Sequence, residues 1–185
     1  PYLKSYNEKN GTNLVMVEPK TFYPLFAMYS DKWDSVDELP DGATIGLCND
    51  ATNQARGLHL LESQGLITLD DSVESPTMYD VKENPHNFKF IEAEMSVLPQ
   101  SIKDVDAICL AAGHMVNAGL SADGYLCQSV DNDTYAVGFA VRAEDKDAQW
   151  VKDFMDAFTS QEQVDRINEK NTPTLSWKIL FEGKE

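Results

Sequence analysis

Hydrophobic residues along the chain follow two spacings, one typical of strands and one typical of helices. Short apolar or alternating runs predict strands at 12–19, 21–30, 44–48, 88–94, 105–112 and 133–145. Helical spacing predicts helices at 2–9, 50–63, 96–104, 113–120 and 147–170, the last with at least one break. Because strands alternate with helices, we expect an α/β fold with mixed, mainly parallel pairing.

Two regions between these elements are candidate crossing points between lobes. One contains Pro40 and Gly42, which follow a short helical turn, and the other lies near Asp131. We therefore expect a discontinuous first lobe made of residues 1–42 and 131–185. Residues 43–130 form the expected second lobe.

The composition is that of an ordinary folded protein, but the charge is strongly negative. The chain has 31 Asp and Glu against 15 Lys and Arg, for a net charge of -16. The sequence has no basic stripe, which argues against nucleic acid and against an anionic membrane surface as partners. This charge fits a soluble, self-repelling extracytoplasmic protein.

The stretch GLCNDATNQARGL, residues 46–58, carries more polar groups than a helix start needs. Asn49, Thr52, Asn53 and Arg56 recur every three or four positions and would share one helical face. A helix N-terminus offers unpaired N–H groups and a partial positive charge. The Arg56 fork matches a carboxylate, so Asn49, Asn53 and Arg56 are a candidate site for an anionic group.

An ordinary explanation of the same stretch stays open. Asn49 or Asp50 could be a simple N-cap, as polar residues at helix starts commonly are. Arg56 could pair with Asp50 or Glu62 on the surface. Spacing alone does not choose between a ligand site and a capped surface helix.

The sequence offers little support for catalysis or for a bound metal. It contains no GxSxG, HExxH or phosphate-cradling glycine loop, and its three His residues are scattered. Cys48 at a helix start could be an activated thiol, but it closes an apolar strand and has no nearby His. Cys48 and Cys109 are predicted to be buried thiols, and whether they form a disulfide stays open. We expect neither an enzyme nor a cofactor.

Several segments together resemble the NlpA-type methionine-binding lipoproteins, which are substrate-binding subunits of ABC importers. They are PYLKSYNEKNGTNLV, SVDELPDGATIGLCNDATNQARGLHLLESQGLITL, ENPHNFKFIEAE, LPQSIKDVDAI and NAGL, with the strand at 135–142. The resemblance covers nearly the whole chain. It implies the two-lobed periplasmic-binding-protein fold (type II), with a ligand cleft between the lobes. It also implies that the chain begins downstream of the family's first strands, so that the first lobe is incomplete at its N-terminus.

The resemblance also assigns roles to individual residues. Arg56 would bind the ligand's α-carboxylate, with Asn49 and Asn53 beside it. Tyr2 would lie near the cleft from the other lobe, and Tyr29 and Tyr135 are either wall residues or core residues. Expected partners are methionine or a related small amino acid and an ABC permease. Attachment to the membrane would be only through an N-terminal lipid outside this chain, on the extracytoplasmic side.

The sequence departs from the family pattern at two polar positions. Ala111 and Val137 stand where methionine binders carry Asn. His114, just beyond Ala111, is either a substitute polar group or an ordinary surface residue. An unsatisfied ligand ammonium costs about 1–3 kcal/mol. The alternative function is therefore a surface lipoprotein that binds a different small carboxylate or has lost ligand binding.

Overall fold

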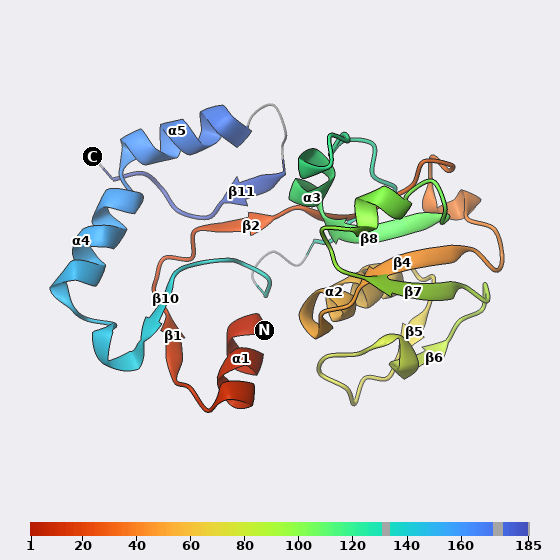
Figure 1. Ribbon diagram of the computed structural model, residues 1–185, viewed down its shortest axis with the longest axis horizontal. Helices are drawn as coiled ribbons and strands as arrows, with labels where there is room; N and C mark the ends of the chain where they lie inside the picture. The colour runs from red at the N-terminus through yellow and green to blue at the C-terminus, as the bar shows by residue number, and fades with distance from the viewer. Residues whose placement is uncertain (131–133, 172–175, 185) are drawn as a thin grey trace. The chain divides into compact units, whose positions relative to one another are not determined.

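The structure is a computed structural model that describes residues 1–130, 134–171 and 176–184. The chain divides into two compact units (Figure 1). Unit 1 comprises Pro1–Pro24 and Asp131–Glu185, and unit 2 comprises Leu25–Val130. Each unit has its own sheets and its own buried residues.

Unit 2 is built on a five-stranded mixed sheet with the strand order β7-β4-β8-β3-β9. Its strands are β3 (Phe26–Tyr29), β4 (Thr44–Cys48), β7 (Lys89–Ala93), β8 (Ala107–Ala111) and β9 (Cys127–Gln128). β4 is parallel to both of its neighbours, β7 and β8, whereas β3 is antiparallel to β8 and β9. The predicted α/β class and mixed sheet are confirmed, and parallel pairing is confined to three strands.

Alternate residues of the central strands face two separate hydrophobic clusters. On β4, Ile45 and Leu47 belong to the first cluster and Cys48 to the second; on β8, Cys109 belongs to the first and Leu110 to the second. Because successive strand residues point to opposite faces, the two clusters lie on opposite sides of the sheet. A strand buried on both faces explains why 105–112 is an uninterrupted apolar run.

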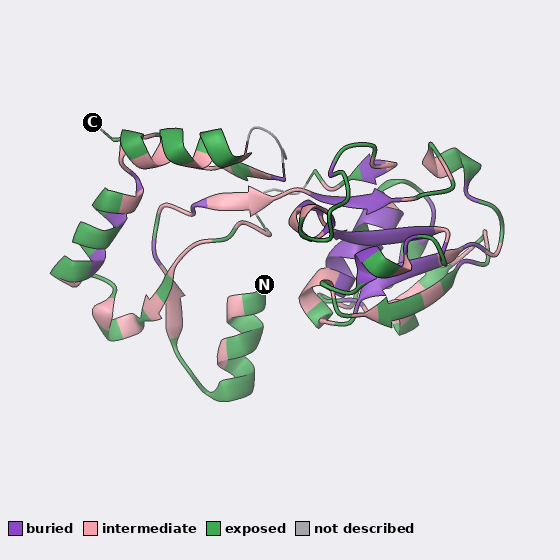
Figure 2. Cartoon of the chain, turned by 45° about the horizontal axis from the view of Figure 1, so that its top comes forward, coloured by how far each residue is buried: buried purple, intermediate pink, exposed green. Residues whose placement is uncertain are grey.

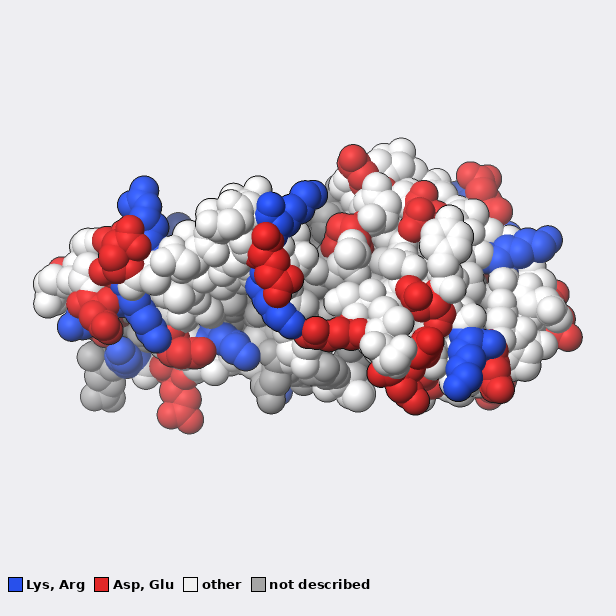
Figure 3. Space-filling model, turned by 90° about the horizontal axis from the view of Figure 1, so that it is seen from below, with Lys and Arg blue, Asp and Glu red and all other residues white. Residues whose placement is uncertain are grey.

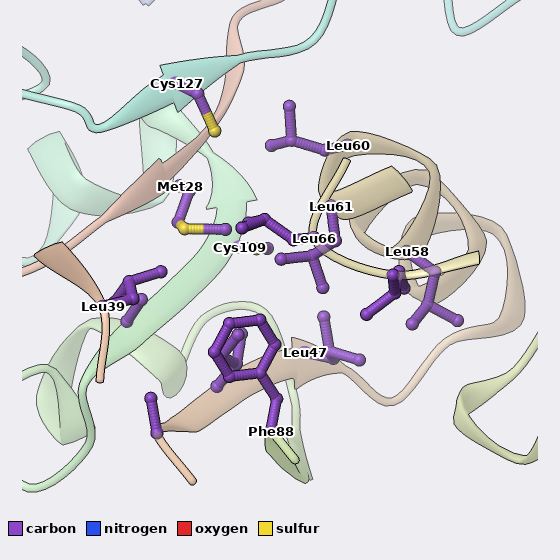
Figure 4. Packing of buried hydrophobic residues seen from close by; sticks show 14 of the residues in the cluster. Met28, Leu39, Leu47, Leu58, Leu60, Leu61, Leu66, Phe88, Cys109 and Cys127 are labelled. Carbon is purple, nitrogen blue, oxygen red and sulfur yellow. The ribbon is translucent and has the colours of Figure 1, made fainter. Parts of the chain in front are cut away.

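A different helix covers each face of this sheet. Helix α2 (Ala51–Ser63) lies on the first face, where its Leu58 and Leu61 join Leu47 and Cys109 (Figure 4). The 3-10 helix η3 (Leu98–Ser101) and helix α3 (Ala112–Asn117) contribute Leu98 and Met115 to the second cluster. The burial pattern in Figure 2 shows this buried sheet between more exposed connections.

The rest of unit 2 consists of short elements in the connections. Strands β5 (Thr68–Leu69) and β6 (Val81–Glu83) form a small antiparallel pair. The 3-10 helices η1 (Val36–Glu38) and η2 (Met78–Asp80) occupy turns, and η2 begins with a capping box in which Thr77 and Asp80 bond each other.

The predicted strand at 21–30 is two strands in the structure. β2 (Phe22–Pro24) pairs with β11 (Trp177–Ile179) in unit 1, whereas β3 pairs with β8 and β9 in unit 2. The chain passes from one unit to the other between Pro24 and Leu25. Residues 25–42 belong to unit 2, whereas the sequence assigns them to the first lobe. The lobe limits at 42 and 130 stay a prediction, and Asp131 lies outside the described residues.

The described residues of unit 1 form three longer helices and two short antiparallel strand pairs. Helix α1 (Tyr2–Asn10) ends at Gly11, and helices α4 (Gln149–Phe158) and α5 (Gln161–Asn171) follow the short 3-10 helix η4 (Ala143–Asp145). β1 (Leu14–Met16) pairs with β10 (Ala140–Arg142), and β2 pairs with β11. The Phe139 ring packs edge-on against the rings of Phe154 and Phe158, with distances of 4.7 and 4.8 Å between the ring centroids.

Most predicted elements are present, several of them with bounds that differ by a few residues. The helix at 2–9, the strand at 44–48, the helix at 50–63 and the broken helix at 147–170 are confirmed. The helix predicted at 96–104 was wrong in length, because only one 3-10 turn forms there before the backbone enters β8. The strand predicted at 133–145 is reduced to a bridge at Val137 and to β10; residue 133 lies outside the described residues.

Each helix among the described residues is too short or too polar to cross a lipid bilayer. Acidic and basic side chains are interspersed on the face shown in Figure 3, without a continuous basic area on that face.

Close packing of α2 on the sheet gives a first prediction. A Cβ at Gly57 would lie 3.0 Å from Leu47 Cδ2 and 3.3 Å from Cys109 Cβ, which is fixed to its backbone. We expect Gly57→Ala to lower the free energy of unfolding by about 1–3 kcal/mol, because the helix must shift outward. Urea unfolding measures the change.

The control is Gly113→Ala in α3, where no atom lies within 4 Å of the added Cβ. A helical Gly→Ala change without a clash should stabilise by about 0.5–1 kcal/mol. Equal effects of the two substitutions would contradict the close approach of α2.

Candidate functional site

The candidate site lies at the edge of the unit 2 sheet where the parallel strands end. β4 ends at Cys48 and β8 ends at Ala111. The chain leaves β4 into α2 on one face and leaves β8 into α3 on the other face. In open α/β sheets, ligands bind outside the carboxyl ends of strands where such connections diverge.

The start of α2 is capped by a carboxylate of the chain itself. Asp50 is the N-cap residue, and its Oδ1 accepts from the Asn53 backbone N–H at 3.0 Å. Both Asp50 oxygens also accept from Asn53 Nδ2, at 3.0 and 3.1 Å. Between the two predicted cap candidates, Asp50 is the cap. The helix start therefore already holds a negative charge, and Asn53 is engaged with it.

Asn49 lies in the link between β4 and α2. Its side chain is exposed, and its backbone N–H donates to the Ala93 carbonyl at the end of β7 at 2.9 Å. This bond holds the link against the neighbouring parallel strand.

Arg56 is a buried cation on the sheet side of α2, with 2% of its surface exposed. Its guanidinium carbon lies 4.6 Å from the centroid of the Phe26 ring. Phe26 opens β3 and pairs with Ala111, so the arginine sits at the carboxyl edge of β8. The ring attracts the cation, and a guanidinium carries its N–H donors in its own plane, where they match a carboxylate. The burial also excludes the alternative of a surface arginine.

Gln54 is a second buried polar residue of this helix, and the sequence did not single it out. Its Nε2 donates to the Cys48 carbonyl at 3.0 Å and to Glu92 Oε1, and its Oε1 accepts from the Met78 backbone N–H at 3.2 Å. The available signal was its spacing of four and seven residues from Leu58 and Leu61, which places a polar residue on the apolar face of the helix.

Tyr29 is not brought to Arg56. It lies three residues beyond Phe26 on β3 and belongs to the cluster on the opposite face. Its hydroxyl donates to the Ala122 carbonyl at 3.1 Å, and burial raises the pKa of this hydroxyl well above its usual value. Tyr29 is placed as a core residue, and the structure gives no contact that favours a ligand role for it.

Tyr2 and Tyr135 belong to unit 1, whereas the other predicted site residues belong to unit 2. Tyr2, in the first turn of α1, is 66% exposed. Tyr135 is half-buried in a turn shortly before the bridge at Val137. Their roles as ligand contacts stay predictions.

The two positions that depart from the family pattern are both apolar and accessible. Ala111 is half-buried at the N-cap of α3, where no side-chain cap bond forms. Val137 is 40% exposed, and its backbone bonds Thr21 and Phe22. His114 is half-buried in α3.

All three cysteines are free and buried. Cys48 and Cys109 lie on adjacent strands but face opposite clusters, and the Cys48 thiol donates to the Cys109 carbonyl at 3.5 Å. Burial and the Asp50 carboxylate raise the pKa of Cys48 to about 12, although Arg56 opposes the shift. Burial raises the pKa of Cys127 to about 11. These thiols stay protonated near neutral pH and are therefore poor nucleophiles.

The raised thiol pKa values predict a loss of stability at alkaline pH. An unfolded thiol ionises near pH 9, whereas Cys48 and Cys127 keep their protons to about 12 and 11. The native state therefore binds more protons above pH 9, so the free energy of unfolding falls as pH rises from there. Thermal unfolding at about pH 8 and about pH 10.5 should show a flatter decline for Cys48→Ala than for the wild type. Identical declines in the two proteins would contradict the shift at Cys48.

No group of three or more His, Cys, Asp or Glu that could hold a metal ion occurs within residues 1–130, 134–171 and 176–184.

Comparison with known proteins identifies the family. The sequence profile of the NlpA lipoproteins (Lipoprotein_9) matches residues 1–176. The chain belongs to the NlpA lipoprotein family. The resemblance predicted from the sequence motifs is thereby confirmed.

Among relatives of this NlpA chain, the D-methionine-binding lipoprotein MetQ of Yersinia pestis is 42% identical over 174 residues. That match covers 91% of this chain and 63% of the relative. The probable D-methionine-binding lipoprotein MetQ of Pasteurella multocida is 40% identical over 166 residues, covering 88% of this chain and 59% of the relative. The chain thus spans about three fifths of the length of the curated relatives it matches.

Solved structures of binding proteins share the fold. A nutrient binding protein from Burkholderia cenocepacia bound to methionine matches with a TM-score of 0.89 and 32% identity, covering 98% of this chain and 76% of that chain. A periplasmic substrate-binding protein of an ABC transporter from Coxiella burnetii matches with a TM-score of 0.83 and 32% identity, covering 91% of this chain and 72% of that chain. The expected periplasmic-binding-protein fold is confirmed.

Proposed function

We propose that this protein is an extracytoplasmic solute-binding lipoprotein of an ABC importer and binds methionine or a closely related small amino acid. Its relatives support this assignment, because they are named D-methionine-binding lipoproteins at 40 and 42% identity. A solved relative with a TM-score of 0.89 is bound to methionine.

The buried Arg56 is the observation that carries the proposal. A cation that is 2% exposed beside an aromatic ring can offer two parallel N–H donors to a carboxylate in a medium of low dielectric constant. Because Asp50 already occupies the start of α2, the ligand's carboxylate binds to Arg56 rather than to the helix N–H groups. This refines the site that the sequence predicted.

The protein's partners follow from the same assignment. An importer's binding protein delivers its ligand to an ABC permease, and a lipoprotein is held at the outer surface of the membrane by an N-terminal lipid. The charge of -16 fits such an extracytoplasmic protein better than one that lies on anionic lipid. The function is binding without chemistry, which fits thiols whose pKa values are raised rather than lowered.

A second candidate is a lipoprotein of the same fold that binds another small carboxylate. Ala111 and Val137 favour it, since neither side chain can hydrogen-bond a ligand ammonium where the family pattern expects Asn. An N-blocked amino acid or a simple carboxylic acid would need no such anchor.

Isothermal titration calorimetry on the protein produced from its complete gene separates the candidates. L-methionine, D-methionine and N-acetylmethionine are titrated in turn. Tight binding of either free amino acid with weak binding of the acetylated one supports the proposal. The reverse order supports the second candidate, and the absence of binding to all three contradicts the assignment of methionine as the ligand.

A further inference from the structure

Gln54 connects three segments of unit 2 that are far apart in the sequence. Its amide nitrogen donates to the last residue of β4 and to Glu92 on β7, and its oxygen accepts from the first residue of η2. Both amide protons and the oxygen are therefore used. The side chain is 3% exposed, so these bonds are made where water cannot replace them at low cost.

These bonds hold α2 from one side. Gln54 ties the helix to β4 and β7 and to the 70–80 connection, while Arg56, two residues later, packs on Phe26 of β3. Residues two apart lie about 200° from each other around a helix. Gln54 and Arg56 therefore leave α2 in nearly opposite directions, and together they fix its rotation about its own axis.

The distance of α2 from the sheet is fixed by a different contact. Gly57 brings the helix against Leu47 and Cys109 with no room for a methyl group. A helix that is held at this distance can still turn about its axis if its polar attachment is lost. Such a turn carries the Arg56 guanidinium, at the end of a long side chain, farther than the backbone itself.

We propose that Gln54 is a positioning residue that sets the place of the Arg56 guanidinium and thereby the affinity for the ligand's carboxylate. The affinity part of this inference rests on the proposed function. Gln54 itself touches no ligand. A guanidinium fork binds a carboxylate through two parallel bonds, so a small displacement weakens both together.

Gln54→Leu removes all three bonds at nearly constant volume. We expect it to raise the Kd for methionine about tenfold, as the loss of one well-aligned charged hydrogen bond would do. The measurement is calorimetry at a temperature at which circular dichroism shows each variant to be fully folded. The matched control is Gln64→Leu, at the exposed C-cap of the same helix, which should bind as the wild type does.

A rescue experiment distinguishes positioning from general destabilisation. Gln54→Glu places a second carboxylate against Glu92 and should weaken binding. Adding Glu92→Gln restores a donor to that contact, and an oxygen at position 54 still accepts from Met78. The double variant should bind methionine more tightly than Gln54→Glu does. Glu92→Gln alone should not raise the affinity above that of the wild type.

A readout without ligand keeps this inference separate from the proposed function. The NMR signal of the Arg56 side-chain Nε–H, close to the Phe26 ring, should shift in Gln54→Leu and stay unchanged in Gln64→Leu. If the wild type binds no methionine, the proposed function fails while the shift still tests the positioning. An unchanged Arg56 signal in a folded Gln54→Leu variant, or methionine binding with the wild-type Kd, overturns the inference.

Discussion

Arg56→Met will abolish binding of a carboxylate ligand while unit 2 stays folded. The methionine side chain ends about where the arginine side chain has its Nε, and it packs well on aromatic rings, so an apolar side chain remains next to Phe26. The charge and all N–H donors are lost. Removing one partner of a buried, hydrogen-bonded charge pair costs about 2–5 kcal/mol, so the Kd should rise at least about 30-fold. Calorimetry with methionine measures it.

A matched control for this substitution lies in unit 1. The Arg142 side chain is 72% exposed and forms a weak pair with Asp145 at 3.5 Å, so Arg142→Met removes the same charge without touching the candidate site. It should leave the Kd unchanged. Arg56→Lys should fall between, because an ammonium lacks the planar fork. Binding of Arg56→Met with the wild-type Kd would show that this arginine is only a structural cation.

Phe26→Ala should have the largest effect on stability. Its ring is fully buried among the residues of the first cluster, and truncation of such a ring costs about 3–5 kcal/mol because a cavity remains. Phe26→Leu keeps most of the volume and removes the aromatic face under Arg56. It should cost below about 1.5 kcal/mol in stability. Chemical denaturation gives both values.

The leucine variant separates packing from support of the cation. A cation–π contact contributes from about 0.5 kcal/mol when exposed to about 2 kcal/mol when desolvated, so Phe26→Leu should weaken methionine binding by about 2- to 30-fold. Phe88→Leu is the control. Phe88 is buried in the same cluster, but its ring stacks on His86, whereas the ring under Arg56 is that of Phe26. Equal affinities of the two variants would rule out a role of the ring in holding the guanidinium.

The parts of the fold that could be predicted are those whose pattern is local. β4 and α2 follow from an apolar run and a helical spacing on either side of a capping residue. Strands β9 and β11 were missed, because they have two or three residues and their partners are distant in the sequence. β11 pairs with β2 about 150 residues earlier, and no local pattern encodes that contact.

The strand at 21–30 shows how a correct local pattern misses topology. The residues are extended throughout, as the sequence predicts, but Phe22–Pro24 and Phe26–Tyr29 pair in different units. Period-2 alternation places Phe26 and Tyr29 on opposite faces, but it does not say which face α2 covers. For this reason the sequence could not decide whether Tyr29 is a wall residue or a core residue.

The candidate site was predicted in its residue types but not in its geometry. Asn49 and Asp50 are both plausible caps, and only the structure shows that Asp50 is the cap and holds Asn53. The burial of Arg56 depends on Phe26, which enters from a strand 30 residues earlier. The role of Gln54 depends on Glu92 and Met78, which no spacing rule connects to it.

The three buried thiols have a practical consequence for the study of ligand binding. Cys48, Cys109 and Cys127 are shielded from solvent, and all have raised pKa values. Maleimide dyes react with the thiolate, so the native protein should stay unlabelled near neutral pH. A single cysteine engineered at an exposed position would then carry one fluorophore at a known place. The native cysteines would therefore not need to be removed before the protein is converted into a fluorescent sensor for its ligand.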